Sequence, residues 1–223
     1  MATYDLEEQE QIDELKTWWK MHGNLVTAVV VAVAVVVVGW LGWNRWQGTQ
    51  AAQASAIYGG VQVATVQQDA KRARELTGEL IDKYSGTSYA GLAALLSAKA
   101  QAEGGDAKSA QAQLAWATDN AKDEGVRDLA RLRLAALLLD DKAYDEAMQR
   151  LAAEPAPSLA PRFNELRGDV LAAQGKLAEA RAAYEAALAK LDVFLKEGGS
   201  EARVRVAYRD VLQVKLDALG GGK

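Results

Sequence analysis

The sequence predicts an all-α protein in which a single N-terminal transmembrane helix is followed by a solenoid of helical repeats. Three observations support this fold class. An uninterrupted apolar run lies near the N-terminus, apolar residues recur at helical spacing beyond residue 50, and turn residues separate segments of helix length. The prolines lie only between residues 155 and 161, and the alternation typical of strands is scarce.

Residues 25–43 form the apolar run and contain no charged side chain. A helix of this length is about 28 Å long, close to the roughly 30 Å hydrocarbon core of a bilayer. A buried strand would be only about 4–8 residues long, and the core helix of a soluble domain would show polar residues at helical spacing. We therefore predict an acidic tail in residues 1–24, a transmembrane helix with its interfacial end in residues 25–46, and a folded domain in residues 47–223.

A cleaved export signal is the alternative to a retained anchor, because Ala52-Gln53-Ala54 has the small-x-small form of a signal peptidase site. The apolar run, however, exceeds the roughly 7–15 residues of a signal core. The residues before it are acidic rather than basic. The sequence therefore favours an anchor that stays in the mature protein.

The basic residues beside the anchor predict its orientation. Lys16 and Lys20 precede the run, and only Arg45 follows it before residue 71. Because basic residues favour the cytoplasmic side, we expect a cytoplasmic N-terminus and an exported C-terminal domain. Tryptophans near both ends of the run fit the aromatic belts of a membrane interface. These are Trp18, Trp19, Trp40, Trp43 and Trp46.

The composition of the exported domain excludes several classes of function. Residues 47–223 carry 24 acidic and 23 basic residues, and this balance argues against a nucleic-acid partner. The chain has no cysteine, and its one histidine, His22, precedes the anchor. We therefore expect no thiol chemistry, no histidine metal site, no cofactor and no Ser-His-Asp catalysis. An enzyme that uses carboxylates remains an alternative, because Asp and Glu are plentiful.

The clearest repeat lies in residues 162–191 and resembles a tetratricopeptide repeat. It has the pattern's two glycines, its aromatic residue and its two alanines on the second helix, at Gly168, Gly175, Ala180, Tyr184 and Ala187. Small residues let the paired helices approach closely, and we expect Tyr184 to fill the space between pairs. The chain departs from the pattern on the first helix, where Asn164 and Arg167 replace the usual Trp and Leu.

Weaker copies precede this repeat, and a single helix follows it. Residues 91–118 and 129–154 place alanines at 110 and 147, which with Ala180 are 37 and 33 residues apart, close to the 34-residue period. Residues 55–84 are predicted to form a degenerate earlier helix pair. Residues 200–219 read as a last helix that caps the stack, with Val204, Ala207, Val211 and Val214 on one face.

The N-terminal tail carries a more specific resemblance. Tyr4 is followed by EEQEQIDELKTWWKMHGN at residues 7–24 and then by the apolar run, which ends in GWLGWNRW. With its repeats and the closing VKLDAL, the chain resembles the YfgM family, ancillary subunits of the bacterial Sec translocon. The resemblance implies a single-pass inner-membrane protein with a periplasmic repeat domain. It also implies association with SecYEG and a PpiD-type periplasmic chaperone, exported proteins as clients, and no catalysis.

The predicted function is that of a membrane-tethered adaptor with chaperone-like activity. In tetratricopeptide repeats the first helix of each pair lines a concave face, whose mixed character here suits a partner helix or an extended chain. The alternatives are a cytoplasmic tail, residues 1–24, that binds and restrains a stress-response regulator, and a periplasmic scaffold for envelope assembly. The candidate partner-binding residues are Leu132, Ala136, Leu139, Arg162, Glu165 and Asp169.

Overall fold

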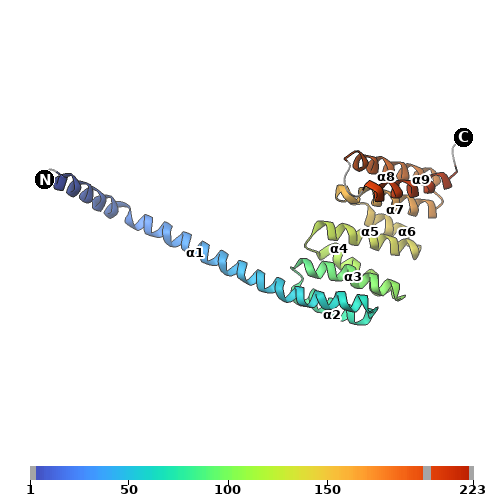
Figure 1. The fold of residues 1–223 in the computed structure, drawn as a ribbon, viewed down its shortest axis with the longest axis horizontal. Helices are drawn as coiled ribbons and strands as arrows, with labels where there is room; N and C mark the ends of the chain where they lie inside the picture. The colour runs from blue at the N-terminus through green and yellow to red at the C-terminus, as the bar shows by residue number, and fades with distance from the viewer. Residues whose placement is uncertain (1–3, 198–201, 221–223) are drawn as a thin grey trace. The chain divides into compact units, whose positions relative to one another are not determined.

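The computed structural model describes residues 4–197 and 202–220, with side chains for residues 11–195 and 206–220. Every regular element in these ranges is helical, which confirms the predicted fold class (Figure 1). Two compact units comprise residues 1–50 and 51–223. The elements are α1 (Tyr4–Val66), α2 (Ala70–Tyr84), α3 (Ser88–Glu103), α4 (Ala107–Asn120), α5 (Glu124–Asp140), α6 (Tyr144–Leu151), the 3₁₀ turn η1 (Pro157–Leu159), α7 (Ala160–Ala173), α8 (Leu177–Glu197) and α9 (Ala202–Ala218).

Helix α1 is 63 residues long and contains the whole apolar run. Its segment Gln11–Val66 is long and apolar enough, by length and composition, to cross a membrane. Most valines of the run are exposed, so their side chains are free to face lipid. The helix continues past Trp46 to Val66, because the intervening residues include several alanines and no proline. The domain boundaries after residues 24 and 46 stay predictions.

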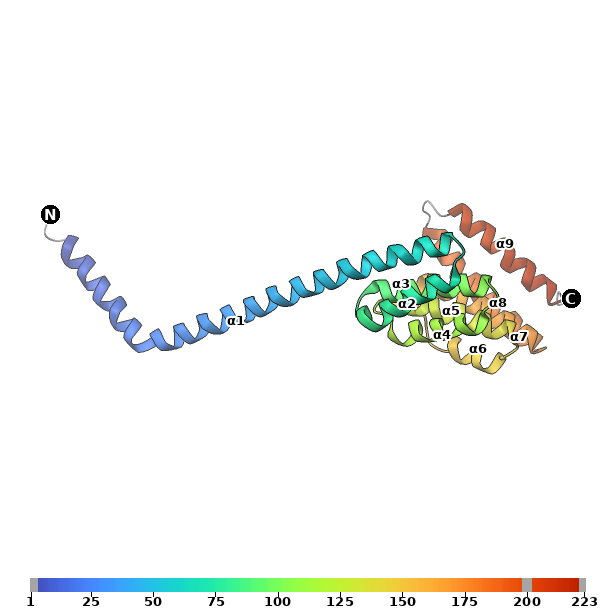
Figure 2. The ribbon, with the colours of Figure 1, turned by 90° about the horizontal axis from the view of Figure 1, so that it is seen from below.

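The second unit is built of helix pairs, in which a first helix packs against the second helix that follows it. Residues 51–66 of α1 pair with α2, and the later pairs are α3 with α4, α5 with α6, and α7 with α8. Helix α3 also contacts α5, and α5 contacts α7. The first helices therefore stack on one another, and Figure 2 shows the stack from a second side.

The same turn joins the helices of each pair and defines the repeat. One residue of each turn has a positive φ: Gln68 (59°), Gly105 (83°), Lys142 (61°) and Gly175 (76°). The next residue donates its backbone N–H to the carbonyl five positions earlier, at 2.8–2.9 Å, as in a Schellman helix end. In the part of the chain that the structure describes, these turn positions are 37, 37 and 33 residues apart.

The buried alanines follow the turns at a constant distance. Ala110, Ala147 and Ala180 each lie five residues after the positive-φ position and are fully buried, which confirms their predicted packing role. Ala73 stands at the same place in the degenerate pair and is also fully buried. Since an alanine contributes only a methyl group at these contacts, the two helices of each pair can pack closely.

Gly168 and Tyr184 form the closest of these helix contacts. A Cβ atom added at Gly168 would lie 2.4 Å from Cε1 of the Tyr184 ring, so only glycine fits. The ring therefore packs across α7 inside its own pair, a contact that the sequence analysis did not foresee. It also joins a cluster with Leu212 and Leu216 of α9, the helix that follows its own pair.

The helix break between α4 and α5 was not predicted from the sequence. Helix α4 ends before Ala121, although no glycine or proline marks the following turn. The Arg127 guanidinium donates to the carbonyl oxygens of Ala121 and Lys122, at 2.8 and 3.1 Å. A side chain from the next helix thus closes the turn, and local composition does not report such a contact. The sequence also predicts a helix break at Gly198-Gly199, and these two residues lie outside the described ranges.

Helix α9 packs through a different face from the one predicted. Leu212 and Leu216 are buried against α8, whereas Ala207, Val211 and Val214 are exposed. The Val204 side chain lies outside the described residues. The observed face combines leucines with polar groups that meet the carboxylates of α7, and this combination outweighs the burial of smaller side chains.

Candidate functional site

An apolar cavity opens between α3 and α5, the first helices of two neighbouring pairs. Its volume is about 330 Å³. The Lys99 ammonium lies 3.7 Å from Glu103 Oε1. The Arg133 guanidinium donates to the Leu95 carbonyl oxygen at 3.2 Å. Charged groups therefore surround an apolar floor. The lining residues are Ala98, Lys99, Ala102, Glu103, Leu114, Arg133, Ala136 and Leu137.

One of the three predicted residues of α5 lines this cavity, and the other two pack against the core. Ala136 lines the cavity. Leu132 and Leu139 are half-buried and pack against the largest core cluster of the repeats. The α5 residues therefore offer apolar surface that the fold only partly covers.

The three predicted residues of α7 belong to a separate polar network with α9. The Lys215 ammonium donates to Glu165 Oε1 and to both carboxylate oxygens of Asp169, each at 2.8 Å. The Tyr208 hydroxyl donates to Glu165 Oε2 at 2.7 Å, and the Tyr184 hydroxyl donates to Asp169 Oδ1 at 2.7 Å. Each carboxylate of α7 is thus held by an ammonium and a phenol.

Arg162 completes this network at its outer edge. Its guanidinium donates to Glu165 Oε2 at 3.4 Å and lies 3.9 Å from the centroid of the Tyr208 ring, which is cation–π geometry. The Arg162 side chain remains 54% exposed, whereas the Glu165 side chain is only 10% exposed. A partner can therefore reach Arg162 directly, but α9 covers Glu165.

The pKa shifts of the network follow from burial and from its charges. Burial raises the pKa of Tyr208, and the hydrogen bond to Glu165 raises it further. Burial and the hydrogen bond to Asp169 act in the same way on the pKa of Tyr184. Burial opposes the charged form of Lys215, but its hydrogen bonds and charge interactions with the two carboxylates raise its pKa overall. The lysine stays charged and both phenols stay protonated throughout the neutral range.

The predicted residues therefore lie in two places on the stack of first helices. Sequence reasoning missed Tyr208 and Lys215, the groups that bind the carboxylates of α7. The available signal was their seven-residue spacing on the last helix, which places both on one side. Without knowing which face of that helix packs, the sequence could not pair them with α7.

The tryptophans of α1 are all exposed: Trp18, Trp19, Trp40, Trp43 and Trp46. Trp18 stacks with His22, with ring centroids 5.3 Å apart, and Trp43 lies 5.2 Å from Trp46. Exposed aromatic rings at these positions are available to lipid or to another protein. Their interfacial role stays a prediction, as does regulator binding by the tail.

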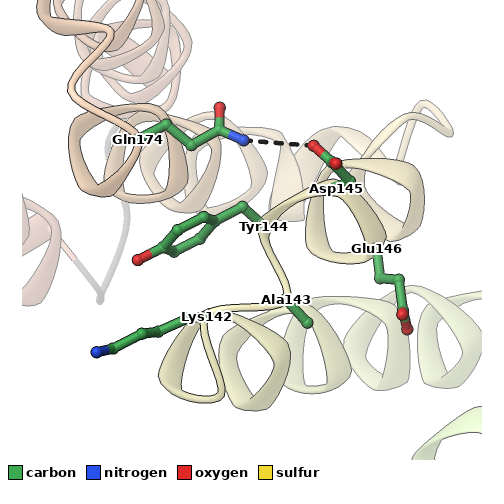
Figure 3. Close-up of a pocket in the computed structure, with 6 residues that line it drawn as sticks. All are labelled: Lys142, Ala143, Tyr144, Asp145, Glu146 and Gln174. Carbon is green, nitrogen blue, oxygen red and sulfur yellow. Dashed lines mark hydrogen bonds between the residues drawn. The ribbon is translucent and has the colours of Figure 1, made fainter.

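A second cavity, of about 300 Å³, lies where the turn before α6 approaches the end of α7 (Figure 3). Figure 3 shows the Gln174 amide directed at Asp145, to which it donates at 3.5 Å. The lining comprises Lys142, Ala143, Tyr144, Asp145, Glu146 and Gln174, none of them a predicted binding residue. Within the described ranges, no group of three or more His, Cys, Asp or Glu side chains is arranged to hold a metal ion.

Comparison with known proteins identifies the family. Residues 16–221 match the model of a tetratricopeptide repeat-like domain. A protein of Neisseria gonorrhoeae (strain ATCC 700825 / FA 1090), named "Ancillary SecYEG translocon subunit", is 32% identical over 217 residues, which cover 96% of this chain and 98% of the relative.

Two further relatives carry the same name. The protein from Haemophilus influenzae (strain ATCC 51907 / DSM 11121 / KW20 / Rd) is 34% identical, and the one from Aggregatibacter actinomycetemcomitans is 29% identical. Each match covers 82% of this chain and 90% of the relative. Because the Neisseria match covers 96% of this chain and the repeat-like model covers residues 16–221, the chain belongs to the YfgM family of ancillary SecYEG translocon subunits.

Proposed function

We propose that this chain is a non-enzymatic subunit of the SecYEG translocon that holds a periplasmic partner beside the channel. Family membership supports the general role, and together with the apolar α1 it supports a single-pass protein of the inner membrane. The partners are a PpiD-type chaperone and exported proteins that leave the channel. The observation that carries the adaptor role is the apolar cavity between α3 and α5.

The chemistry of that cavity suits a helix or an extended chain. Ala102, Ala136 and Leu137 provide an apolar floor, and Lys99 and Arg133 provide charges beside it. Apolar side chains of a partner would gain about 25 cal/mol per Å² buried, while the charges select orientation. Anchoring in one membrane raises the effective concentration of the partners, so a modest affinity is sufficient.

The α7 end of the same stack has a different part in this proposal. Arg162 is accessible and takes part in the partner-binding surface. Glu165 and Asp169 hold α9 in place, and through it they support the end of the repeat stack.

Photocrosslinking in living cells tests the groove. A photoreactive residue at Ala136 should crosslink to a periplasmic chaperone or an exported protein. The same residue at Ala112, an exposed alanine on the second helix α4, is the matched control and should give no such product. Equal crosslinks from both positions, or none from Ala136, would contradict the groove assignment.

A substitution in the same experiment separates binding from folding. Leu139→Asp should reduce the Ala136 crosslinks several-fold and leave membrane insertion intact, because it places a charge among apolar contacts. Leu139 also packs against the core, so circular dichroism of the purified variant is the control. A folded variant with unchanged crosslinks would contradict the groove assignment. As a control, Ala112→Asp should change neither the Ala136 crosslinks nor membrane insertion.

The same proposal places the N-terminus in the cytoplasm and residues 47–223 in the periplasm. Protease added to spheroplasts should degrade the repeat domain and leave a protected fragment that contains the anchor. Lysis before protease addition should remove that protection from the tail. A protected repeat domain, or a mature chain that begins near Ser55, would contradict this orientation.

A further inference from the structure

The outer face of α9 is an apolar surface that the described fold leaves uncovered. Val211 and Val214 are 50% and 67% exposed, and Ala207 and Ala218 lie on the same side of the helix. Their spacing of four, three and four residues is that of the a and d positions of a coiled coil. The opposite side carries Leu212, which is fully buried. We call residues 207, 211, 214 and 218 the outer stripe.

Helix α9 differs from the other first helices in what covers it. Helices α3, α5 and α7 are each packed by the second helix of their own pair. Helix α9 packs on α8 and reaches α7 through its side chains, and within the described residues no second helix follows it. Within the described residues, α9 is therefore a helix without a second helix of its own pair, and its outer stripe leaves room for one more helix.

The charges beside the outer stripe indicate what that helix must carry. Asp210 and Asp217 are seven residues apart, are exposed and flank the stripe on the edge away from α7. Asp217 accepts a hydrogen bond from Gln213 at 3.0 Å, but among the described residues no cation pairs with either aspartate. An added helix with lysine or arginine along this edge would neutralise both carboxylates.

The same charges disfavour a second copy of this chain. Antiparallel pairing of two outer stripes would place Asp210 of one copy beside Asp217 of the other, and like charges repel. Parallel pairing would need a cation from the other edge of α9. Lys215 lies there, but its ammonium is already held by Glu165 and Asp169.

We propose that the outer stripe of α9 binds an amphipathic helix of a partner protein, whose small apolar residues meet the valines and whose basic edge meets Asp210 and Asp217. This surface is separate from the cavity between α3 and α5, so the inference does not rest on the proposed groove. It adds a second attachment point at the far end of the repeat stack.

The test uses the full-length protein in nanodiscs of zwitterionic lipid and a labelled helical peptide. The peptide carries alanine and leucine at its a and d positions and lysine at the flanking positions. A second peptide has glutamate in place of every lysine. Fluorescence anisotropy should show that the lysine peptide binds at least roughly tenfold more tightly than the glutamate peptide, and that added salt weakens its binding. Empty nanodiscs control for binding to lipid.

Two protein variants locate the binding surface. Val214→Glu should weaken binding of the lysine peptide by roughly tenfold or more, because the burial of a valine side chain contributes a free energy of that size to binding. Val63→Glu, a substitution at a comparably exposed valine outside α9, should leave binding unchanged. The double variant Asp210→Lys with Asp217→Lys should reverse the preference and bind the glutamate peptide. This reversal cannot arise from misfolding.

Several results would overturn the proposal. Equal binding of the two peptides would show unspecific apolar contact. Absence of binding to the wild-type protein would show that the outer stripe is not a binding site for such a helix. Self-association in sedimentation that Val214→Glu abolishes would assign the stripe to a second copy of the chain. The expected result, by contrast, is loss of peptide binding in Val214→Glu with unchanged groove crosslinks from Ala136, because the two surfaces are separate.

Discussion

Gly168→Ala is expected to destabilise the repeat domain by about 1–3 kcal/mol, the usual cost of overpacking a core. The added Cβ would lie 2.4 Å from Cε1 and 2.5 Å from Cδ1 of the Tyr184 ring, so α7 and α8 must separate or the ring must move. Tyr184 is buried and its hydroxyl is bound to Asp169, which restricts that movement. Thermal unfolding of the full-length protein, followed by circular dichroism, measures the loss.

Two controls identify the cause of that loss. Gly78→Ala in α2 adds the same atom where nothing lies within 4 Å, and it should stabilise the domain by about 0.5–1 kcal/mol through helix propensity. Adding Tyr184→Leu to Gly168→Ala should cost less than the sum of the two single changes, since the smaller side chain relieves the clash. Equal effects of Gly168→Ala and Gly78→Ala would show that the close approach is unimportant.

Lys215→Met is expected to destabilise the α7–α9 contact by about 1–3 kcal/mol, because it leaves Glu165 and Asp169 without their shared cation in a partly buried site. The matched control on the same helix is Arg209→Met. Its ion pair with Asp192 is exposed, so the loss should stay below about 1 kcal/mol. Limited proteolysis would report release of α9. Similar effects of the two changes would contradict a special role for Lys215.

The same network predicts a loss of stability in alkaline solution. The folded-state pKa values of Lys215, Tyr184 and Tyr208 are all raised, so the folded protein binds these protons more tightly than the unfolded chain does. Their stabilisation is complete below about pH 10, near the unfolded values, and is lost as the pH rises through the folded values. Lys215→Met and Tyr208→Phe should each reduce this dependence. An unchanged alkaline transition in both variants would contradict the assignment.

Local patterns sufficed where the physics is local. The apolar length of residues 25–43 predicts a membrane-crossing helix without reference to any neighbour, because lipid requires that length and composition. Glycines at 105 and 175 predict turns because glycine adopts a positive φ at little cost, and both residues have a positive φ in the structure. The constant offset from each turn to a buried alanine then reveals the pairs, including the degenerate one around Ala73.

Patterns that depend on a neighbouring helix could not be resolved in this way. The turn at residues 121–123 depends on a guanidinium from α5, and Arg167 replaces a usual leucine because its guanidinium donates to the Leu151 carbonyl oxygen. Leu132 and Ala136 of α5 occupy the same repeat positions as Glu165 and Asp169 of α7, because the turns that follow the two helices are 33 residues apart. The packing of α9 covers the candidate residues Glu165 and Asp169 of α7, whereas those of α5 stay accessible, and the sequence does not show this difference.

The sequence by itself determined the helical class, the anchor, the repeat period and the family resemblance, since each follows from spacing along one chain. The tertiary structure decided which face of α9 is buried. Only one of its two apolar sides brings Tyr208 and Lys215 within hydrogen-bonding distance of the α7 carboxylates. That choice covers Glu165, exposes Val211 and Val214, and so places the uncovered apolar surface at the end of the stack.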